Sequence, residues 1–194
     1  MNISEREPTL DSLPVRLQWC LLHLYILGIC GILLAAFFVQ FGLGDAPCTL
    51  CLLQRCCMIL AALGPTWIIA TATGTSASPL ENLSRGFGIS VIASVLGLTI
   101  SARQILMHIA PGDPGFGIPI FGYHLTTWSF IIFWVILLIS GTTLLFSRSL
   151  APTAKSQLGR YSKATLALLG SLIFANVVVV FFTHGAFAPL VQTP

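Results

Sequence analysis

Apolar residues fall into five long runs, which shorter polar segments separate. The runs cover about residues 17–41, 49–72, 86–107, 123–146 and 164–182. A helix rises ~1.5 Å per residue, so each run is long enough to cross a hydrocarbon layer of ~30 Å. The pattern therefore predicts an all-α integral membrane protein, a bundle of five transmembrane helices.

Composition indicates that the chain is surrounded by membrane lipid. Of its 194 residues, 56% are hydrophobic and 8% are charged, and the mean hydropathy is +0.93. An ordinary soluble domain carries about 25% charged residues, so this chain has too few to cover a surface that faces water. The net charge of +3 is small and scattered, which argues against a nucleic-acid partner.

Basic residues predict the orientation of the helices. If five helices cross in order, seven basic residues fall on one side of the membrane: Arg6, Arg16, Arg85, Arg148, Lys155, Arg160 and Lys163. Lys and Arg are retained on the cytoplasmic side of a membrane. We therefore expect a cytoplasmic amino terminus in a bacterial inner membrane. The loop that holds Cys48 would then lie on the oxidising, periplasmic side.

The same pattern divides the chain into four segments. We expect a cytoplasmic tail (1–16), a four-helix membrane domain (17–147), a basic cytoplasmic loop (148–163), and a fifth helix with an outer tail (164–194).

A C-x-x-C pair stands where the second apolar run begins. Cys48 and Cys51 follow Pro47, and Arg55 comes four residues after Cys51. This spacing lets two sulfurs meet across one helical turn, and unpaired amides with the positive end of the helix dipole stabilise a thiolate there. Arg55 shares a helix face with Cys51 and adds positive charge. The arrangement predicts a redox-active disulfide.

The cysteines allow two other interpretations, simple burial and a metal site. Free cysteines are often simply buried, but burial alone does not explain the proline, the arginine and the oxidising side together. A metal site needs four converging thiolates, whereas adjacent Cys56 and Cys57 point about 100° apart on a helix. We expect the other cysteines to be packing residues: Cys20, Cys30, Cys56 and Cys57.

The polar residues near the outer ends of the helices leave alternatives open. Arg55 either extends to the interface as an anchor or holds the carbonyl oxygen of a quinone. Arg103 and Gln104 are either interfacial and interhelical groups or part of the site. His108 and His124 flank the second outer loop and are either interfacial residues or a proton donor.

The segment Pro47-Cys48-Thr49-Leu50-Cys51, followed by Gln54-Arg55, resembles the motif of the disulfide-bond formation protein B (DsbB) family. The resemblance extends to Ala102-Arg103-Gln104 and Trp128 and covers about residues 17–147. It implies an inner-membrane oxidoreductase that passes electrons from a thiol protein to a quinone, ubiquinone or menaquinone. Cys48 and Cys51 would be the catalytic pair, with Cys51 facing the quinone and Cys48 exchanging with the incoming thiol. Arg55 would bind the quinone.

The chain departs from the family pattern in three places. Gln54 replaces the usual glutamate, a fifth helix follows the four, and the second outer loop (109–122) is short. Family members usually carry a second cysteine pair in that loop, but this chain has no cysteine after Cys57. The partner is therefore open: a periplasmic, thioredoxin-like DsbA-type oxidase or another thiol protein. A non-catalytic quinone-binding or structural subunit, and a carrier that delivers reductant outward, are the alternative functions.

Overall fold

The computed structural model describes residues 15–44, 47–71, 78–109, 119–151 and 159–184. Five of its helices are long and apolar enough to cross a membrane, which confirms the predicted all-α membrane fold. The predictions for the tail 1–14, for residues 110–118 and 152–158, and for the outer tail 185–194 fall outside the described residues.

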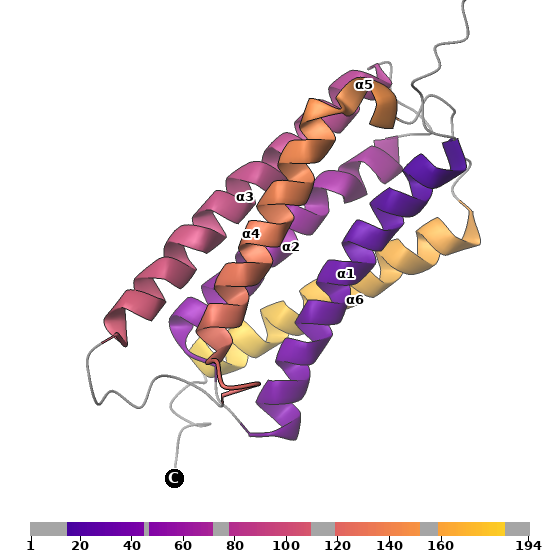
Figure 1. Cartoon of the computed structure of the whole chain (residues 1–194). Coiled ribbons are helices and arrows are strands. Elements are labelled where there is room, and N and C mark those ends of the chain that lie inside the picture. The colour runs from indigo at the N-terminus through magenta and orange to yellow at the C-terminus, as the bar shows by residue number, and fades with distance from the viewer. Residues whose placement is uncertain (1–14, 45–46, 72–77, 110–118, 152–158, 185–194) are drawn as a thin grey trace, which may run out of the picture.

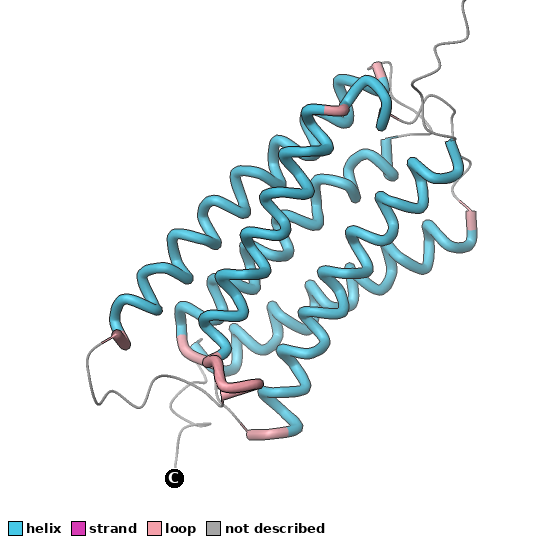
Figure 2. Tube along the Cα trace, viewed as in Figure 1, coloured by secondary structure: helices cyan, strands magenta, loops and turns pink. Residues whose placement is uncertain are grey.

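The long helices lie side by side and alternate in direction (Figures 1 and 2). In chain order they are α1 (Val15–Gly42), α2 (Thr49–Thr71), α3 (Pro79–Met107), α4 (Leu125–Leu145), α5 (Ser147–Leu150) and α6 (Arg160–His184). α5 is a single turn that follows α4. Helix α2 packs against α1 and α3, α3 packs against α4, and α6 covers α1 and α2. α2 is therefore the helix with neighbours on most sides.

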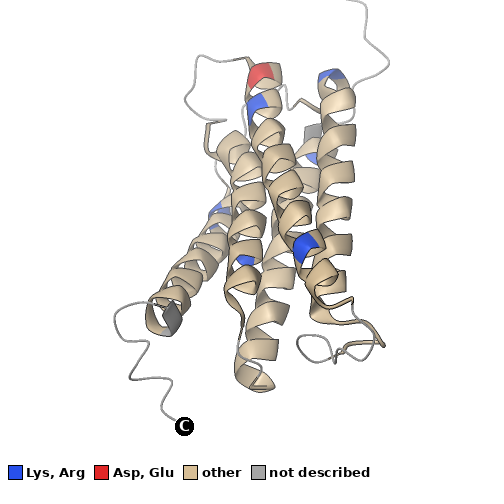
Figure 3. Ribbon diagram, turned by 90° about the vertical axis from the view of Figure 1, so that its left-hand side faces the viewer, with Lys and Arg blue, Asp and Glu red and all other residues tan. Residues whose placement is uncertain are grey.

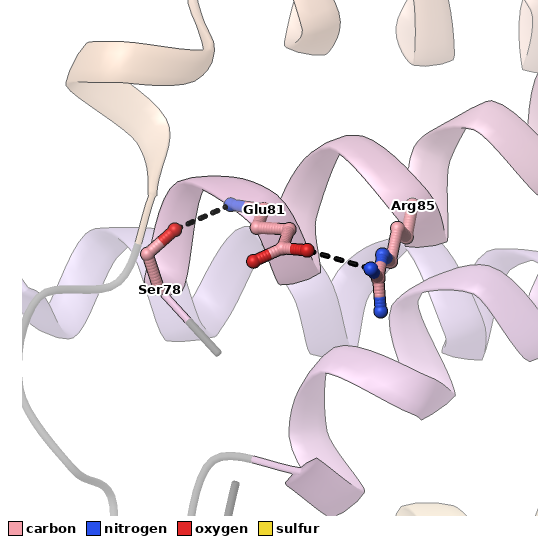
Figure 4. A network of polar contacts seen from close by, with 3 residues as sticks. All are labelled: Ser78, Glu81 and Arg85. Atoms are coloured by element: carbon pink, nitrogen blue, oxygen red, sulfur yellow. Dashed lines mark hydrogen bonds and ion pairs between the residues drawn. The ribbon is translucent and has the colours of Figure 1, made fainter. Parts of the chain in front are cut away.

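Helix α3 begins seven residues earlier than the apolar pattern predicted. Ser78 is its N-cap, and the Ser78 hydroxyl oxygen accepts a hydrogen bond of 3.2 Å from the backbone N–H of Glu81. Pro79 occupies the first turn, where its missing N–H costs nothing. Glu81 pairs with Arg85 at 2.6 Å, one turn further on (Figure 4). The predicted loop 71–85 is thus partly helical, because the cap and the ion pair carry the helix beyond the apolar run.

Two glycines let α2 and α3 approach closely. A Cβ on Gly64 would overlap the backbone oxygen of Gly86, and a Cβ on Gly86 would come within 2.6 Å of the oxygen of Gly64. Pro65 lies inside α2 and cannot donate to the carbonyl of Ala61. The Ser90 hydroxyl of α3 donates to that carbonyl at 2.7 Å. In a span surrounded by lipid, such a freed carbonyl must be satisfied by a neighbouring helix.

Most of the Lys and Arg positions that Figure 3 colours lie toward the end of the bundle where α1 begins. That end also holds the carboxyl ends of α2 and α4 and the first turns of α3 and α6. The asymmetry predicted from the basic residues is therefore present in the folded chain.

We expect Gly64→Ala to destabilise the fold by about 1–3 kcal/mol, because the added methyl group forces two packed backbones apart. Gly88→Ala in α3 is the matched control, since nothing lies within 4 Å of the position of its Cβ. Thermal unfolding of the purified variants in detergent measures both. Equal melting temperatures for the two variants would contradict the close α2–α3 contact.

Candidate active site

Cys48 caps the first turn of α2. Its carbonyl oxygen accepts from the N–H of Leu52 at 3.1 Å, and its sulfur accepts from the N–H of Cys51 at 3.2 Å. The two sulfurs lie 2.7 Å apart. The pair thus lies at the positive end of a helix, and the sulfur of Cys48 accepts a hydrogen bond from a backbone N–H of the first turn that has no partner within the helix.

These contacts favour the thiolate form of Cys48. The hydrogen bond from the Cys51 thiol, together with backbone N–H groups and the amide of Gln104, lowers the pKa of Cys48 to about 6 against the opposing effect of partial burial. Thiolates are the attacking and leaving species in thiol–disulfide exchange. A half-buried Cys48 with this pKa is therefore ionised at neutral pH and suited to exchange.

Helix α3 contributes Gln104 to the pair. The Gln104 side-chain nitrogen lies 3.2 Å from the sulfur of Cys48 and 3.6 Å from that of Cys51. Its side-chain oxygen accepts a hydrogen bond of 3.0 Å from Gln54 of α2. Both glutamines are buried. Two neutral amides, one on α3 and one on α2, therefore form a hydrogen-bonded chain that ends at the cysteine pair.

Arg55 faces the protein interior. Its side chain is only 7% exposed, and its guanidinium donates to Gln40 at 2.7 Å and to the carbonyl of Ala36 at 3.1 Å, both on α1. It also lies 5.2 Å from the centre of the Phe37 ring, where a cation is attracted to the aromatic face. This pose differs from an anchor extended to the interface.

A cavity of about 320 Å³ lies beside both Cys51 and Arg55. Cys51, Gln54 and Arg55 line one side of it, and apolar residues of α1 and α4 line much of the rest. Ligand pockets are typically mostly apolar with a few polar groups, and their volumes start near 300 Å³. The cavity is therefore large enough for a small ring and places that ring beside Cys51.

A tight turn before α4 forms part of the cavity wall. Ile120 and Tyr123 pair across Phe121 and Gly122, which have φ angles of 51° and 81°. The indole N–H of Trp128 donates to the carbonyl of Ile120 at 3.0 Å. This bond fixes the turn against α4 and keeps Ile120 and Phe121 at the cavity.

Other residues weighed from the sequence do not join the pair. Arg103 is exposed on α3, and neither His108 nor His124, which flank α3 and α4, lines the cavity. Of the remaining cysteines, Cys30 and Cys57 are buried in the core, and Cys20 and Cys56 are exposed. No group of three or more His, Cys, Asp or Glu side chains gathers into a metal site in the described residues.

Sequence reasoning missed two partners of Arg55 and left Gln104 undecided. Gln40 and Phe37 precede the motif on another helix, and no local spacing connects them to it. The signal that was available is the rarity of polar side chains in an apolar run: Gln40 and Gln104 each interrupt such a run near one of its ends.

Comparison with known proteins finds similarity to disulfide bond formation proteins over about half of the chain. A family model described as disulfide bond formation protein DsbB matches residues 18–117. A disulfide bond formation protein B of Chromohalobacter salexigens is 36% identical over 99 residues, 50% of this chain and 52% of that protein. One of Xanthomonas oryzae pv. oryzae is 33% identical over 100 residues, 50% of this chain and 55% of the relative. The chain thus matches about half the length of these curated relatives, and no solved structure matches it.

We expect the alkylation rate of Cys48 in the reduced protein to reach half its maximum near pH 6. The thiolate is the reactive form, so the rate should rise about ten-fold per pH unit below the pKa and level off above it. Iodoacetamide labelling, with the modified position read by mass spectrometry, measures the profile. Urea-denatured protein is the control, in which the midpoint should return to about 8.5. A midpoint near 8.5 in the folded protein would contradict the hydrogen bonding described above.

Proposed function

Because the chain belongs to the disulfide bond formation protein DsbB family, we propose that it is a membrane thiol:quinone oxidoreductase that supports disulfide-bond formation. The observation that carries the proposal is one apolar cavity bordered by both Cys51 and Arg55. Cys48, at the other side of the pair, is half-exposed at the start of the helix. In this proposal, Cys48 reacts with a thiol that arrives from the aqueous side, and Cys51 faces an acceptor that is soluble in the lipid.

The cavity suits a quinone ring. Its walls are largely apolar, as a flat ring requires, and the guanidinium of Arg55 has further N–H groups beyond the two that bind α1. Thr126 and Ser129 of α4 add hydroxyl groups to the lining. A larger apolar cavity of about 490 Å³ shares Ile32, Trp128 and Ile132 with this one, which gives an isoprenoid tail a path along α1 and α4.

The chain's own residues perform the exchange. An incoming thiolate attacks the sulfur of Cys48, a new disulfide forms, and the Cys48–Cys51 bond breaks with its electron pair on Cys51. A second thiolate of the donor then attacks the donor's own bridged sulfur, and Cys48 leaves as a thiolate. The donor is oxidised and the pair is reduced. A bound quinone supplies an acceptor for two electrons and two protons, and their loss restores the disulfide.

The partner we propose is a periplasmic, thioredoxin-like thiol oxidase of the DsbA type. With no cysteine after Cys57, Cys48 itself receives the electrons from this partner. The orientation that fits is a cytoplasmic end at the basic first turns of α1, α3 and α6, which places Cys48 on the oxidising side. Ubiquinone and menaquinone both match the cavity chemistry.

Trapping tests the exchange step. The partner for this test is a thioredoxin-like oxidase whose second active-site cysteine is serine and whose first is activated as a mixed disulfide with thionitrobenzoate. The Cys48 thiolate of Cys51→Ser should displace the thionitrobenzoate and accumulate as a mixed disulfide with the oxidase, because neither protein then has a second thiol to displace it. Cys48→Ser should accumulate none of this kind. Non-reducing electrophoresis measures the adduct, and replacement of Cys20, Cys30, Cys56 and Cys57 by alanine is the control that should preserve quinone reduction by a dithiol donor. An inactive but folded control variant would show that another cysteine belongs to the relay.

Arg55→Met should raise the apparent KM for a soluble ubiquinone analogue about ten- to hundred-fold, because a hydrogen bond to a charged group contributes about 1.5–3 kcal/mol. Steady-state quinone reduction, followed by ultraviolet absorbance, measures it. Gln40→Leu is the matched variant, since it removes the partner of Arg55 on α1 and keeps the charge; its KM should change less. An unchanged KM in Arg55→Met would show that Arg55 connects α1 and α2 but does not bind the quinone.

A further inference from the structure

One amide of α3 reaches both sulfurs of the redox pair. The side-chain nitrogen of Gln104 lies 3.2 Å from the sulfur of Cys48 and 3.6 Å from that of Cys51. Gln104 is 2% exposed, so water does not compete for this donor. A hydrogen bond to a charged acceptor is about twice as strong as a neutral one, and here the acceptor becomes a thiolate during exchange.

Gln54 determines which end of that amide faces the sulfurs. Its own side-chain nitrogen donates to the oxygen of Gln104 at 3.0 Å, and Gln54 is itself 3% exposed. The reversed orientation of Gln104 would place two NH₂ groups against each other and an oxygen against the sulfurs. The donor chain from Gln54 to Gln104 to the pair is therefore the satisfied arrangement of these buried groups.

We propose that Gln104 is a catalytic hydrogen-bond donor that stabilises the thiolate on each sulfur in turn, and that Gln54 is the positioning residue that aims it. The proposal rests on the function proposed above. When an incoming thiolate bonds to Cys48, the electron pair of the broken disulfide goes to Cys51. When the donor closes its own disulfide, the electron pair goes to Cys48. The Gln104 nitrogen is within reach of both positions without moving to another site.

A neutral amide suits this position for a physical reason. Within the described residues, the titratable groups beside the pair are the two cysteines themselves and Arg55 of α2, while α3 meets the pair with the uncharged Gln104. An amide does not titrate, so the donor is present at every working pH. A carboxylate at position 54 has no N–H for the oxygen of Gln104, and Gln104 would turn its NH₂ group toward that carboxylate and away from the sulfurs.

The test is the pH profile of Cys48 alkylation in the reduced, full-length protein whose other four non-motif cysteines are alanine. No partner and no quinone are needed. Gln104→Leu should lower the iodoacetamide rate at pH 6 several-fold and move the midpoint upward, because a thiolate donor is lost. Gln54→Glu should act in the same direction with Gln104 still in place. Gln54→Leu removes the hydrogen bond that orients the Gln104 amide, and it should give a smaller upward shift of the midpoint.

Ser101→Ala is the matched control. Ser101 is buried one turn earlier on α3, and its hydroxyl donates to the carbonyl of Gly97 in the same helix. This change perturbs the core of α3 but should leave the midpoint unchanged. A contribution of Gln104 to packing alone would lower the melting temperature of Gln104→Leu without moving the midpoint, and that result would overturn the proposal. If Gln104→Leu does not fold, the midpoint of Gln54→Leu decides the question, because this variant removes the contact to Gln104 without adding a charge beside the thiolate. An unshifted midpoint in Gln54→Leu would then overturn the proposal.

The alkylation test distinguishes a failure of the role proposed for Gln104 from a failure of the proposed oxidoreductase function. A chain that reduces no quinone, yet shows the shifts, would refute the oxidoreductase proposal and preserve the role of Gln104 as the thiolate donor. A chain that reduces quinone normally in Gln104→Leu, with an unshifted midpoint, would preserve the function and refute the role of Gln104.

Discussion

The direct contact between α2 and α3 is the constraint on which the candidate site depends. Hydrocarbon offers no hydrogen bonds, so polar groups inside the spans must find partners on other helices. Gly64 and Gly86 bring the two backbones together, and Ser90 satisfies the carbonyl that Pro65 leaves open. The helices run antiparallel, so the same contact continues toward the start of α2 and ends with Gln104 against the cysteine pair. The geometry of the site is thus a consequence of a contact made several turns away.

The second constraint is the guanidinium of Arg55, which is buried beside the pair. An ionised guanidinium inside a span is costly unless its donors are used. Gln40, the carbonyl of Ala36 and the ring of Phe37 all meet Arg55 from α1. The same residue therefore ties α1 to α2 and holds a positive charge near Cys51.

Local patterns were sufficient for the spans and for the cysteine pair. The length of each apolar run follows from membrane thickness, and a C-x-x-C at a helix start depends on residues within one turn. The start of α3 was missed although its Ser78 cap and Glu81 lie close together in sequence, because the apolar run was given more weight than the cap. Gln40, Phe37 and Gln104 could not be assigned, because their roles depend on which faces of separate helices meet, and periodicity within one helix contains no such information.

The two sulfurs of one small ring lie in different surroundings, and this follows from helix geometry. Cys48 is the cap, outside the span, with its sulfur held by the amide of the first turn. Cys51 is already helical, and it faces the cavity that Arg55 also borders. A spacing of three residues is thus enough to place one sulfur at an amide of the helix start and the other against a largely apolar cavity.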